Sequence, residues 1–356
     1  MSSLHVVISG YFGFHNTGDE AILLSMIKSL RRVDPDIRIT VLSNDPVHTS
    51  ETYEVEAADR WNLKQIYLLL SQADGLISGG GSLLQDATGI KSIIYYTGVI
   101  RIARLWKKPV FVYAQGMGPI DSFLGKKLVK GALNKGVQIT VRDEESKELL
   151  KKFGVRNPIE LVPDPVMTLE TNTLMSFWLE EKKLSNIITV SVRDWPTTMN
   201  YKEKIALALD AFAESGYDIV FVPMHGDHDE ETSYEILEHM VEKAHIAPQY
   251  VPIEEKIAII KKSELLVGMR LHSLIFATIG HVPFVALSYD PKIDSFARIC
   301  DQPVAGHVSD DDWTAQDLID TMERALTQTY APSETMIRLQ KEADDTAAMA
   351  INYLSR

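Results

Sequence analysis

The sequence predicts an α/β protein with a parallel, doubly wound sheet in each of two halves. Short apolar segments of strand length alternate with helical stretches up to about residue 162 and again from residue 187, which is the pattern of parallel sheets. The alternation pauses between Asp164 and Asn186, so we place the joint there. Apolar residues make up 45% and charged residues 24% of the 356 residues, a balance that supplies the cores of two ordinary domains.

The first half is expected to begin with a buried strand at residues 5–9, a glycine-bearing loop and a helix over residues 20–32. Thr17 and Glu20 have the spacing of a capping box, which predicts the start of this helix. A strand at residues 37–42 completes a strand–helix–strand unit. Further apolar segments predict strands at residues 75–78, 110–114, 138–141 and 159–162.

The second half restarts with a strand at residues 187–192 and a helix over residues 202–215, which carries apolar residues at core spacing and ends at Gly216. Further strands are expected at residues 219–222, 265–267 and 283–287, and two helices at residues 315–328 and 333–354. The domains expected from this order are an N-terminal one, a C-terminal one and a final helix, over residues 1–175, 176–332 and 333–356.

Composition narrows the class of protein. Net charge is −13, which argues against a general nucleic-acid binder. Cys300 is the one cysteine, so no intrachain disulfide forms and a cysteine-rich zinc site is excluded; we expect the reducing cytoplasm. No apolar run approaches the ~20 residues of a membrane span, and the start lacks a basic region before an apolar stretch, so neither a spanning nor a secreted protein is expected.

The glycine-bearing loop has phosphate-loop spacing, with Gly13 and Gly18 flanking four residues. The next residue is Asp19 where such a loop carries a lysine, so ATP binding is not expected. One interpretation is a loop that places Asn16, Asp19 and Glu20 near a ligand. The other is a tight turn with a helix cap.

Two more glycine-rich segments follow predicted strands. Gly80 and Gly81 lie between a strand and a helical stretch, and Gln115 opens the segment QGMGP. Glycines let a ligand approach the backbone, and a helix start offers unpaired N–H groups to anions. Close packing of strand and helix explains the same glycines equally well.

Arginines and one histidine follow other predicted strands. Arg142 and Arg193 each end a strand, where an arginine can clamp a phosphate or carboxylate; a surface salt bridge to the adjacent acids is the alternative. In LLVGMRLHS, Arg270 and His272 come at a strand-to-helix turn, and Lys292 follows the next strand. This set suits a small phosphorylated acid, against the alternative of a capping histidine and solvated cations.

Two further stretches allow two interpretations each. PMHGDHDEE, around His225 and His228, matches no zinc signature, so a solvated acidic loop is favoured over a metal site. The apolar stretch at residues 90–106, with interspersed basic residues, could lie at a membrane interface, but a core helix with a basic end is favoured.

Taken in order, the motifs resemble the polysaccharide pyruvyl transferase family, and most closely its CsaB branch of bacterial cell-wall enzymes. The resemblance runs from Ser9 to about Lys292, and its motifs are SGYFGFHNTGDEAIL, ISGGGSLLQD, YAQGMGP, VRDEES, VPDP, SVRDWP and GMRLHSLIFA followed by YDPK. The GMRLH segment and the GYFGFHNTGDE loop are the most specific of these.

The resemblance implies two Rossmann-like domains facing a cleft, as in GT-B glycosyltransferases, with the acceptor on the N-terminal side and phosphoenolpyruvate on the C-terminal side. It implies transfer of pyruvate from phosphoenolpyruvate to a sugar as a ketal. In the CsaB branch the acceptor is a disaccharide linked to undecaprenyl diphosphate, with N-acetylmannosamine as the modified sugar. The product, a pyruvylated secondary cell-wall polymer, anchors S-layer proteins. A cytoplasmic enzyme in peripheral contact with the inner face of the membrane is therefore expected.

The resemblance also implies residue roles. His272 is expected to be the general acid, and Arg142, Arg193, Arg270 and Lys292 are expected to bind phosphoenolpyruvate. The reaction has no redox step, so no nicotinamide or flavin is required, and no metal ligand set is evident. The residues expected on the acceptor side are Asn16, Asp19, Glu20, Gly80, Gly81 and Gln115.

Two other functions remain open from the residues. A GT-B glycosyltransferase that uses a nucleotide sugar has the same expected fold, and fold does not fix function. A non-catalytic sugar-binding or scaffold protein is the third candidate. Binding of phosphoenolpyruvate or of a uridine diphosphate sugar separates the first two, and phosphate release in the presence of donor and acceptor excludes the third.

Overall fold

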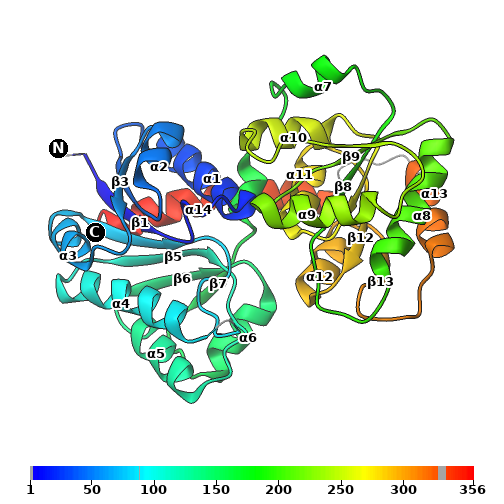
Figure 1. The fold of residues 1–356 in the computed structure, drawn as a ribbon. Helices are drawn as coiled ribbons and strands as arrows, with labels where there is room; N and C mark the ends of the chain where they lie inside the picture. Colours follow the sequence, from blue (N-terminus) through cyan, green and yellow to red (C-terminus); the bar gives the residue numbers. More distant parts are fainter. Residues whose placement is uncertain (1–2, 88, 328–333) are drawn as a thin grey trace. The chain divides into compact units, whose positions relative to one another are not determined.

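The structure, a computed structural model, describes residues 3–87, 89–327 and 334–356. It contains two compact units (Figure 1), of which the first holds Met1–Thr168 with Arg338–Arg356 and the second Leu169–Ile337. The joint lies earlier than the predicted 175/176. Thr168 is hydrogen-bonded to Ser29 of the first unit, whereas Thr171 donates to the carbonyl of Ile279 in the second.

The first unit is built on a seven-stranded parallel sheet with the order β3-β2-β1-β4-β5-β6-β7. Its strands are β1 (His5–Ser9), β2 (Arg38–Ser43), β3 (Glu56–Asp59), β4 (Gly75–Gly79), β5 (Val110–Gln115), β6 (Val137–Val141) and β7 (Ile159–Leu161). The strand order reverses between β1 and β4, and ligands of such sheets bind beyond the carboxyl ends of the strands at this point.

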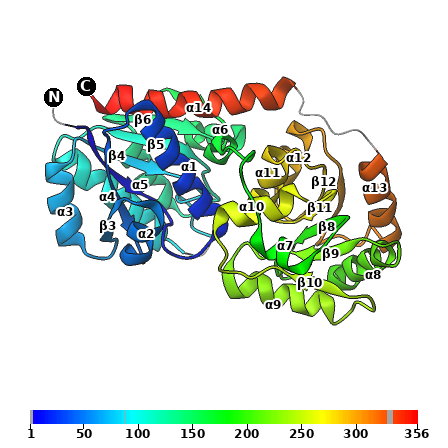
Figure 2. The same ribbon diagram turned by 90° about the horizontal axis from the view of Figure 1, so that it is seen from above.

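Helices cover both faces of this sheet. They are α1 (Thr17–Val33), α2 (Pro46–Tyr53), α3 (Leu63–Gln72), α4 (Lys91–Leu105), α5 (Phe123–Leu133), α6 (Glu144–Lys152) and α14 (Glu334–Leu354), with a short 3-10 helix at Pro165–Thr168. On one face, helices α3, α4, α5 and α6 pack on the sheet through a single apolar cluster. On the other face, α14 runs beside α1 (Figures 1 and 2), and Arg32 of α1 forms an ion pair with Asp344 at 2.9 Å.

The last helix therefore packs on the first unit instead of standing apart as the predicted 333–356 segment. Leu354 fills the space over Gly75 of β4, and Tyr353 contacts Phe111 of β5 with ring centroids 6.4 Å apart. The predicted helix ends at residues 328 and 333 lie outside the described residues.

The second unit holds a six-stranded parallel sheet with the order β10-β9-β8-β11-β12-β13. Its strands are β8 (Ile187–Ser191), β9 (Asp218–Phe221), β10 (Ala244–Ile246), β11 (Leu265–Gly268), β12 (Phe284–Ser288) and β13 (Val304–His307). Its helices are α7 (Phe177–Lys182), α8 (Tyr201–Glu214), α9 (Gly226–Leu237), α10 (Ile253–Lys261), α11 (Leu271–Ile279), α12 (Pro291–Ile299) and α13 (Ala315–Thr327). Here the order reverses between β8 and β11.

All ten predicted strands are present, and the prediction missed three. The three missed strands, β3, β10 and β13, each lie at an edge of a sheet and pair on one side only. These three strands are partly exposed, so they lack the continuous apolar run that marks a central strand in the sequence. The fourth edge strand, β7, was predicted from the short apolar segment at residues 159–162. The stretch at residues 90–106 is a core helix, as favoured, because Ile93, Tyr96 and Ile100 of α4 are buried.

Candidate functional sites at the carboxyl edge of each sheet

The second sheet collects polar residues at the carboxyl ends of its central strands. Arg193 follows β8, Arg270 follows β11, His225 follows β9 and Tyr289 follows β12. Since β8 and β11 are the strands between which the order reverses, Arg193 and Arg270 flank the position where α/β sheets bind ligands. The sequence placed each of these arginines after a predicted strand, and the strand order brings the two to one sheet edge.

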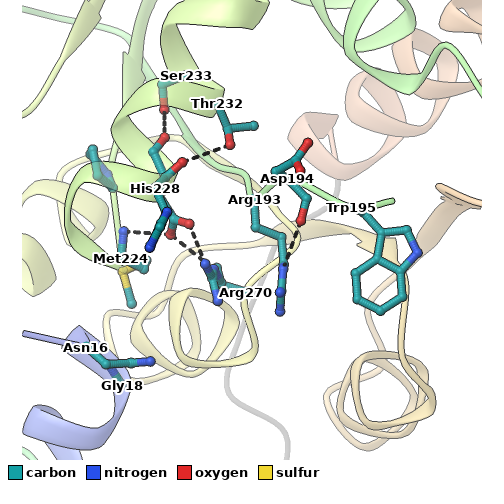
Figure 3. Close-up of polar contacts among 12 residues, drawn as sticks. Asn16, Gly18, Arg193, Asp194, Trp195, Met224, His228, Thr232, Ser233 and Arg270 are labelled. Atoms are coloured by element: carbon teal, nitrogen blue, oxygen red, sulfur yellow. Dashed lines mark hydrogen bonds and ion pairs between the residues drawn. The ribbon is translucent and has the colours of Figure 1, made fainter. Parts of the chain in front are cut away.

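A buried carboxylate fixes Arg270. Asp229 of α9 is 1% exposed and takes both Nε and Nη2 of Arg270, the former at 3.0 Å from Oδ2 (Figure 3). The same carboxylate accepts the backbone N–H of Met224 at 3.1 Å. A two-pronged, desolvated pair of this kind sets the orientation of the guanidinium. Asp229 belongs to the stretch PMHGDHDEE, and its burial shows that the expected solvated acidic loop is wrong at this residue.

Around this pair lie further titratable groups. Burial and the charge of Arg270 lower the pKa of His225, whose ring centroid lies 5.5 Å from that of His228. Burial lowers the pKa of the Lys256 ammonium to about 8, which the carboxylate of Asp229 partly opposes. Lys256 Nζ donates to the carbonyl of Pro223 at 2.7 Å. The site therefore holds an imidazole poised to stay neutral beside an arginine.

Arg193 is held by aromatic rings. Its guanidinium lies 4.7 Å from the ring centroid of Tyr289 and 5.4 Å from that of Trp195, and Nη1 donates to the Tyr289 hydroxyl at 3.1 Å. Tyr201 anchors the loop by donating to the carbonyl of Arg193 and accepting from the N–H of Trp195. Nε of Arg193 donates to the backbone carbonyl of Asp194 at 3.4 Å (Figure 3). Among the described residues no carboxylate pairs with Arg193, so the alternative of a surface salt bridge is wrong here and the charge remains available to an anion.

His272 lies on α11, the helix that follows β11, and Lys292 lies on α12, the helix that follows β12. Lys292 Nζ is 2.8 Å from Asp290 Oδ2 and 5.6 Å from the ring centroid of Tyr289. Arg270 is the N-cap residue of α11, and His272 is half-buried in the first turn of that helix. Three of the four predicted donor-binding cations thus belong to the second unit, together with His272.

The fourth, Arg142, belongs to the first unit. It follows β6, is buried, and donates to Asp164 Oδ2 at 3.0 Å, beyond the end of β7. Ser82 Oγ accepts from its Nη2 at 3.3 Å. A Cβ on Gly116 would come within 3.1 Å of the guanidinium, so the glycine leaves the space that Arg142 fills. The side chains of this pair are buried, and Arg142 Nε also lies 3.7 Å from Oδ2 of the adjacent Asp143, so the alternative of a salt bridge to an adjacent acid is met in part.

The loop after β1 is held by Glu20. This buried carboxylate accepts the N–H of Gly13 and the hydroxyl of Tyr53, each at 2.7 Å. Asn16 is the N-cap of α1 and accepts from Gly18, so the predicted capping box with Thr17 as the cap is wrong. Because both Glu20 oxygens are used inside the protein, its role in the structure is to shape the loop.

The glycines at the end of β4 are explained by packing. Gly80 and Gly81 have φ of +79° and +63°, a region that side chains rarely adopt. Ile22 occupies the space over Gly80, and the carboxylate of Asp19 lies over Gly81. Gln115, at the end of β5, is fully buried, and neither of its amide atoms has a partner in the part of the chain described here. Of these residues, half-buried Asp19 remains the one that a ligand can reach.

An aromatic cluster around Arg60 was missed by the sequence analysis. Arg60 follows β3 and is buried; it donates to the carbonyl of Gly10 at 2.9 Å and to the hydroxyl of Tyr96 at 3.1 Å. Its guanidinium lies 4.5–5.5 Å from the centroids of the rings that enclose it, which belong to Phe14, Trp61, Tyr95 and Tyr96. Trp61 is exposed. The cluster escaped notice because β3, the edge strand that places Arg60, was not predicted.

His225 was missed for a different reason. The strand before it was predicted, but the acidic residues after it suggested a solvated loop. The rule that ligands bind beyond strand ends was sufficient to find it.

In the described ranges no group of three or more histidine, cysteine or acidic side chains is arranged to hold a metal ion. No helix within those ranges is both long and apolar enough to cross a membrane.

Known structures with the same fold define the class. The UDP complex of MnaA from Staphylococcus aureus matches with a TM-score of 0.64 and 12% identity, covering 99% of this chain and 96% of MnaA. The UDP-GlcNAc 2-epimerase of Methanocaldococcus jannaschii matches with a TM-score of 0.66 and 12% identity, covering 98% and 99%. Anabaena Alr3699/HepE in complex with UDP-glucose matches with a TM-score of 0.59 and 11% identity, covering 99% of this chain and 97% of Alr3699/HepE. The predicted GT-B-like fold class is confirmed.

Sequence comparison then places the chain within this class. The profile of the polysaccharide pyruvyl transferase family matches residues 16–291, and the chain belongs to this family. The amylovoran biosynthesis protein AmsJ of Erwinia amylovora is 24% identical over 259 residues, which cover 65% of this chain and 60% of AmsJ. The chain therefore matches about three-fifths of the length of that relative. The predicted family is confirmed.

Proposed function

We propose that this protein transfers pyruvate from phosphoenolpyruvate to a sugar as a cyclic ketal and releases phosphate. The observation that carries the proposal is the arginine pair at the β8–β11 reversal, because Arg193 has no carboxylate partner among the described residues. Phosphoenolpyruvate is small and carries a phosphate and a carboxylate, both of which arginine binds in two-pronged fashion. Family membership supports pyruvyl transfer in general.

For the acceptor we propose N-acetylmannosamine in a disaccharide linked to undecaprenyl diphosphate, within the synthesis of a secondary cell-wall polymer that anchors S-layer proteins. The support is the resemblance of the GYFGFHNTGDE and GMRLH segments to cell-wall members of the family. AmsJ, named for amylovoran biosynthesis, supports a role in polysaccharide synthesis more broadly. We place the enzyme in the cytoplasm on the same ground.

The proposed chemistry starts with protonation of the methylene carbon of phosphoenolpyruvate, which makes the neighbouring carbon electrophilic. One sugar hydroxyl attacks this carbon, and its proton is lost. The bond from this carbon to the phosphate oxygen breaks, and phosphate leaves with the electron pair. A second hydroxyl then attacks, closes the ring and gives up its proton, which balances the proton that the departing phosphate takes up. The added proton stays in the product as part of a methyl group, so a general acid is essential.

We assign these tasks to residues of the second unit. His272, in the first turn of α11, is the proposed general acid. Arg193 and Arg270 would hold the phosphate and carboxylate, and Lys292 would stabilise the leaving phosphate. Arg270 acts in an orientation that Asp229 fixes. Arg142, buried with Asp164 in the first unit, remains a proposed donor contact on the resemblance alone.

For the acceptor side we propose the carboxyl edge of the first sheet, where Asn16 caps α1 at the end of the loop after β1 and Asp19 lies in the first turn of that helix. Exposed Trp61 beside the Arg60 cluster adds a flat apolar surface with polar neighbours, which suits a sugar ring. Glu20, Gly80, Gly81 and Gln115 would support this edge from within.

The test is to incubate the protein with phosphoenolpyruvate and a short lipid-linked disaccharide analogue and to measure product mass and phosphate together. We expect one pyruvyl group gained for each phosphate released. Transfer from a uridine diphosphate sugar, with no use of phosphoenolpyruvate, would show instead a glycosyltransferase. No phosphate release with any donor would leave a binding or scaffold protein.

A further inference from the structure

The segment from Lys91 to Lys135 has a charge opposite to that of the whole chain. It carries nine lysines and arginines and one aspartate, in a protein whose net charge is −13. None of the nine forms an ion pair with a carboxylate within the described ranges. The segment contains α4 and α5, which lie next to each other on one face of the first sheet (Figure 1).

Exposed apolar side chains lie among these charges. Phe123 is 82% exposed and Leu124 51% exposed in the first turn of α5, and Ile94 of α4 is exposed as well. A Cβ on Gly125 would lie 2.9 Å from Ile93 Cδ1, so the first turns of the two helices touch. Lys126 and Lys127 follow directly in the chain, and Lys91 begins α4. We call these six residues (Lys91, Ile94, Phe123, Leu124, Lys126 and Lys127) the docking surface.

The turn that presents Phe123 is held in place. The carboxylate of Asp86 accepts the N–H groups of Asp121 and Ser122, each at 2.9 Å, and the Ser122 hydroxyl at 2.5 Å. The Ser122 hydroxyl also caps α5 by accepting from Gly125. These hydrogen bonds fix the turn before Phe123. The exposure of Phe123 is therefore a property of the folded turn and does not result from a frayed helix end.

We propose that the docking surface binds an anionic lipid bilayer. Basic residues are attracted to acidic headgroups, and aromatic and aliphatic side chains insert at the boundary with the acyl chains. A second copy of this chain is disfavoured, because the same unpaired cations would face each other across the contact. The first turns of α4 and α5 lie at the carboxyl edge of the first sheet, so a bilayer on this surface would lie beside the proposed acceptor side.

The test is co-sedimentation of the full chain with vesicles of phosphatidylcholine, with or without phosphatidylglycerol, in the absence of any substrate. We expect binding to the anionic vesicles only, lost as salt is raised. Lys126→Gln with Lys127→Gln should lower the partition coefficient about 30-fold, since each basic residue contributes about fivefold near an anionic surface. Phe123→Ser should lower it about tenfold.

Helix α7 supplies matched controls. Phe177 is 71% exposed there and Lys182 and Lys183 follow, but Glu180 and Glu181 balance the charge. Phe177→Ser and the double variant Lys182→Gln, Lys183→Gln should leave vesicle binding unchanged. Equal binding to neutral vesicles, no binding at all, or equal losses in the α7 variants would overturn the proposal. Because no substrate is present, the result does not depend on pyruvyl transfer.

Discussion

Asp229 illustrates how a single residue defines the site. In the sequence it lies in an acidic run, where solvation is the ordinary expectation. In the structure it is buried and orients Arg270 through two hydrogen bonds. Conversely, Arg193 precedes an acidic residue yet contacts aromatic rings instead of the Asp194 carboxylate. The residue types were predictable from the strand ends, but the partners Asp229 and Tyr289 were not, because they come from segments far from Arg270 and Arg193 in the chain.

At His272 we predict a split between binding and turnover. His272→Ala should retain phosphoenolpyruvate binding and lose turnover about 10²–10⁴-fold, the usual contribution of a general acid. Binding is measured by calorimetry and turnover by phosphate release. Arg270→Ala is the comparison, because it should weaken donor binding directly. Unchanged turnover in His272→Ala would place the acid elsewhere.

His225 makes stability depend on pH. Its pKa is lowered in the folded protein by burial and by Arg270, so the unfolded chain binds more protons as pH falls below the ordinary value of 6.5. The free energy of unfolding therefore decreases on acidification. For the His225→Asn variant, the free energy of unfolding should fall less steeply than for wild type between about pH 7 and pH 5. Urea unfolding at a series of pH values measures this slope.

His5 of the first unit also has a lowered pKa, and it contributes equally to the pH dependence of wild type and of the His225→Asn variant. Exposed His239 provides the control, since His239→Asn should keep the slope of wild type. An unchanged slope in His225→Asn would contradict the assignment.

At the scale of elements, every central strand was predictable, whereas of the four edge strands only β7 was. The apolar runs of β1, β5 and β11 are buried on both faces, so the sequence marks them strongly. β3 has the sequence EAAD and is partly exposed. Missing it also hid Arg60 and its rings. Predicted sites depend on predicted strands, because strand ends decide which loops share an edge.

The loop after β1 gives a prediction at this scale. Glu20→Ala would leave two buried donors, the Gly13 N–H and the Tyr53 hydroxyl, without their acceptor. Each such loss costs about 1–3 kcal/mol, so the free energy of unfolding should fall by about 2 kcal/mol or more. Glu51→Ala, at an exposed carboxylate of α2, should change it much less. Equal losses in urea titrations would show that Glu20 does not hold the loop.

For the whole molecule, the two units differ in how the chain completes them. The second unit is one continuous segment, whereas the first needs the last helix from the far end of the chain. A sequence contains no direct sign of such a return. The alternation of strands and helices predicted two halves, but the covering of β4 and β5 by Leu354 and Tyr353 was visible only in the structure.

Removal of residues 338–356 should therefore affect one unit selectively. Deletion uncovers apolar surface on the first sheet and removes the Arg32–Asp344 pair. Amide hydrogen exchange should accelerate in β1, β4 and β5 and stay unchanged in β8 and β11. Acceleration of equal size in both sheets would contradict this division of the chain.

The proposed protonation of an enol phosphate at carbon is tested most directly by the product formed in heavy water. With phosphoenolpyruvate and the disaccharide analogue, mass spectrometry should show a pyruvyl ketal whose methyl group carries one deuterium. A ketal with no deuterium in its methyl group, or a product that keeps the methylene carbon, would contradict the account.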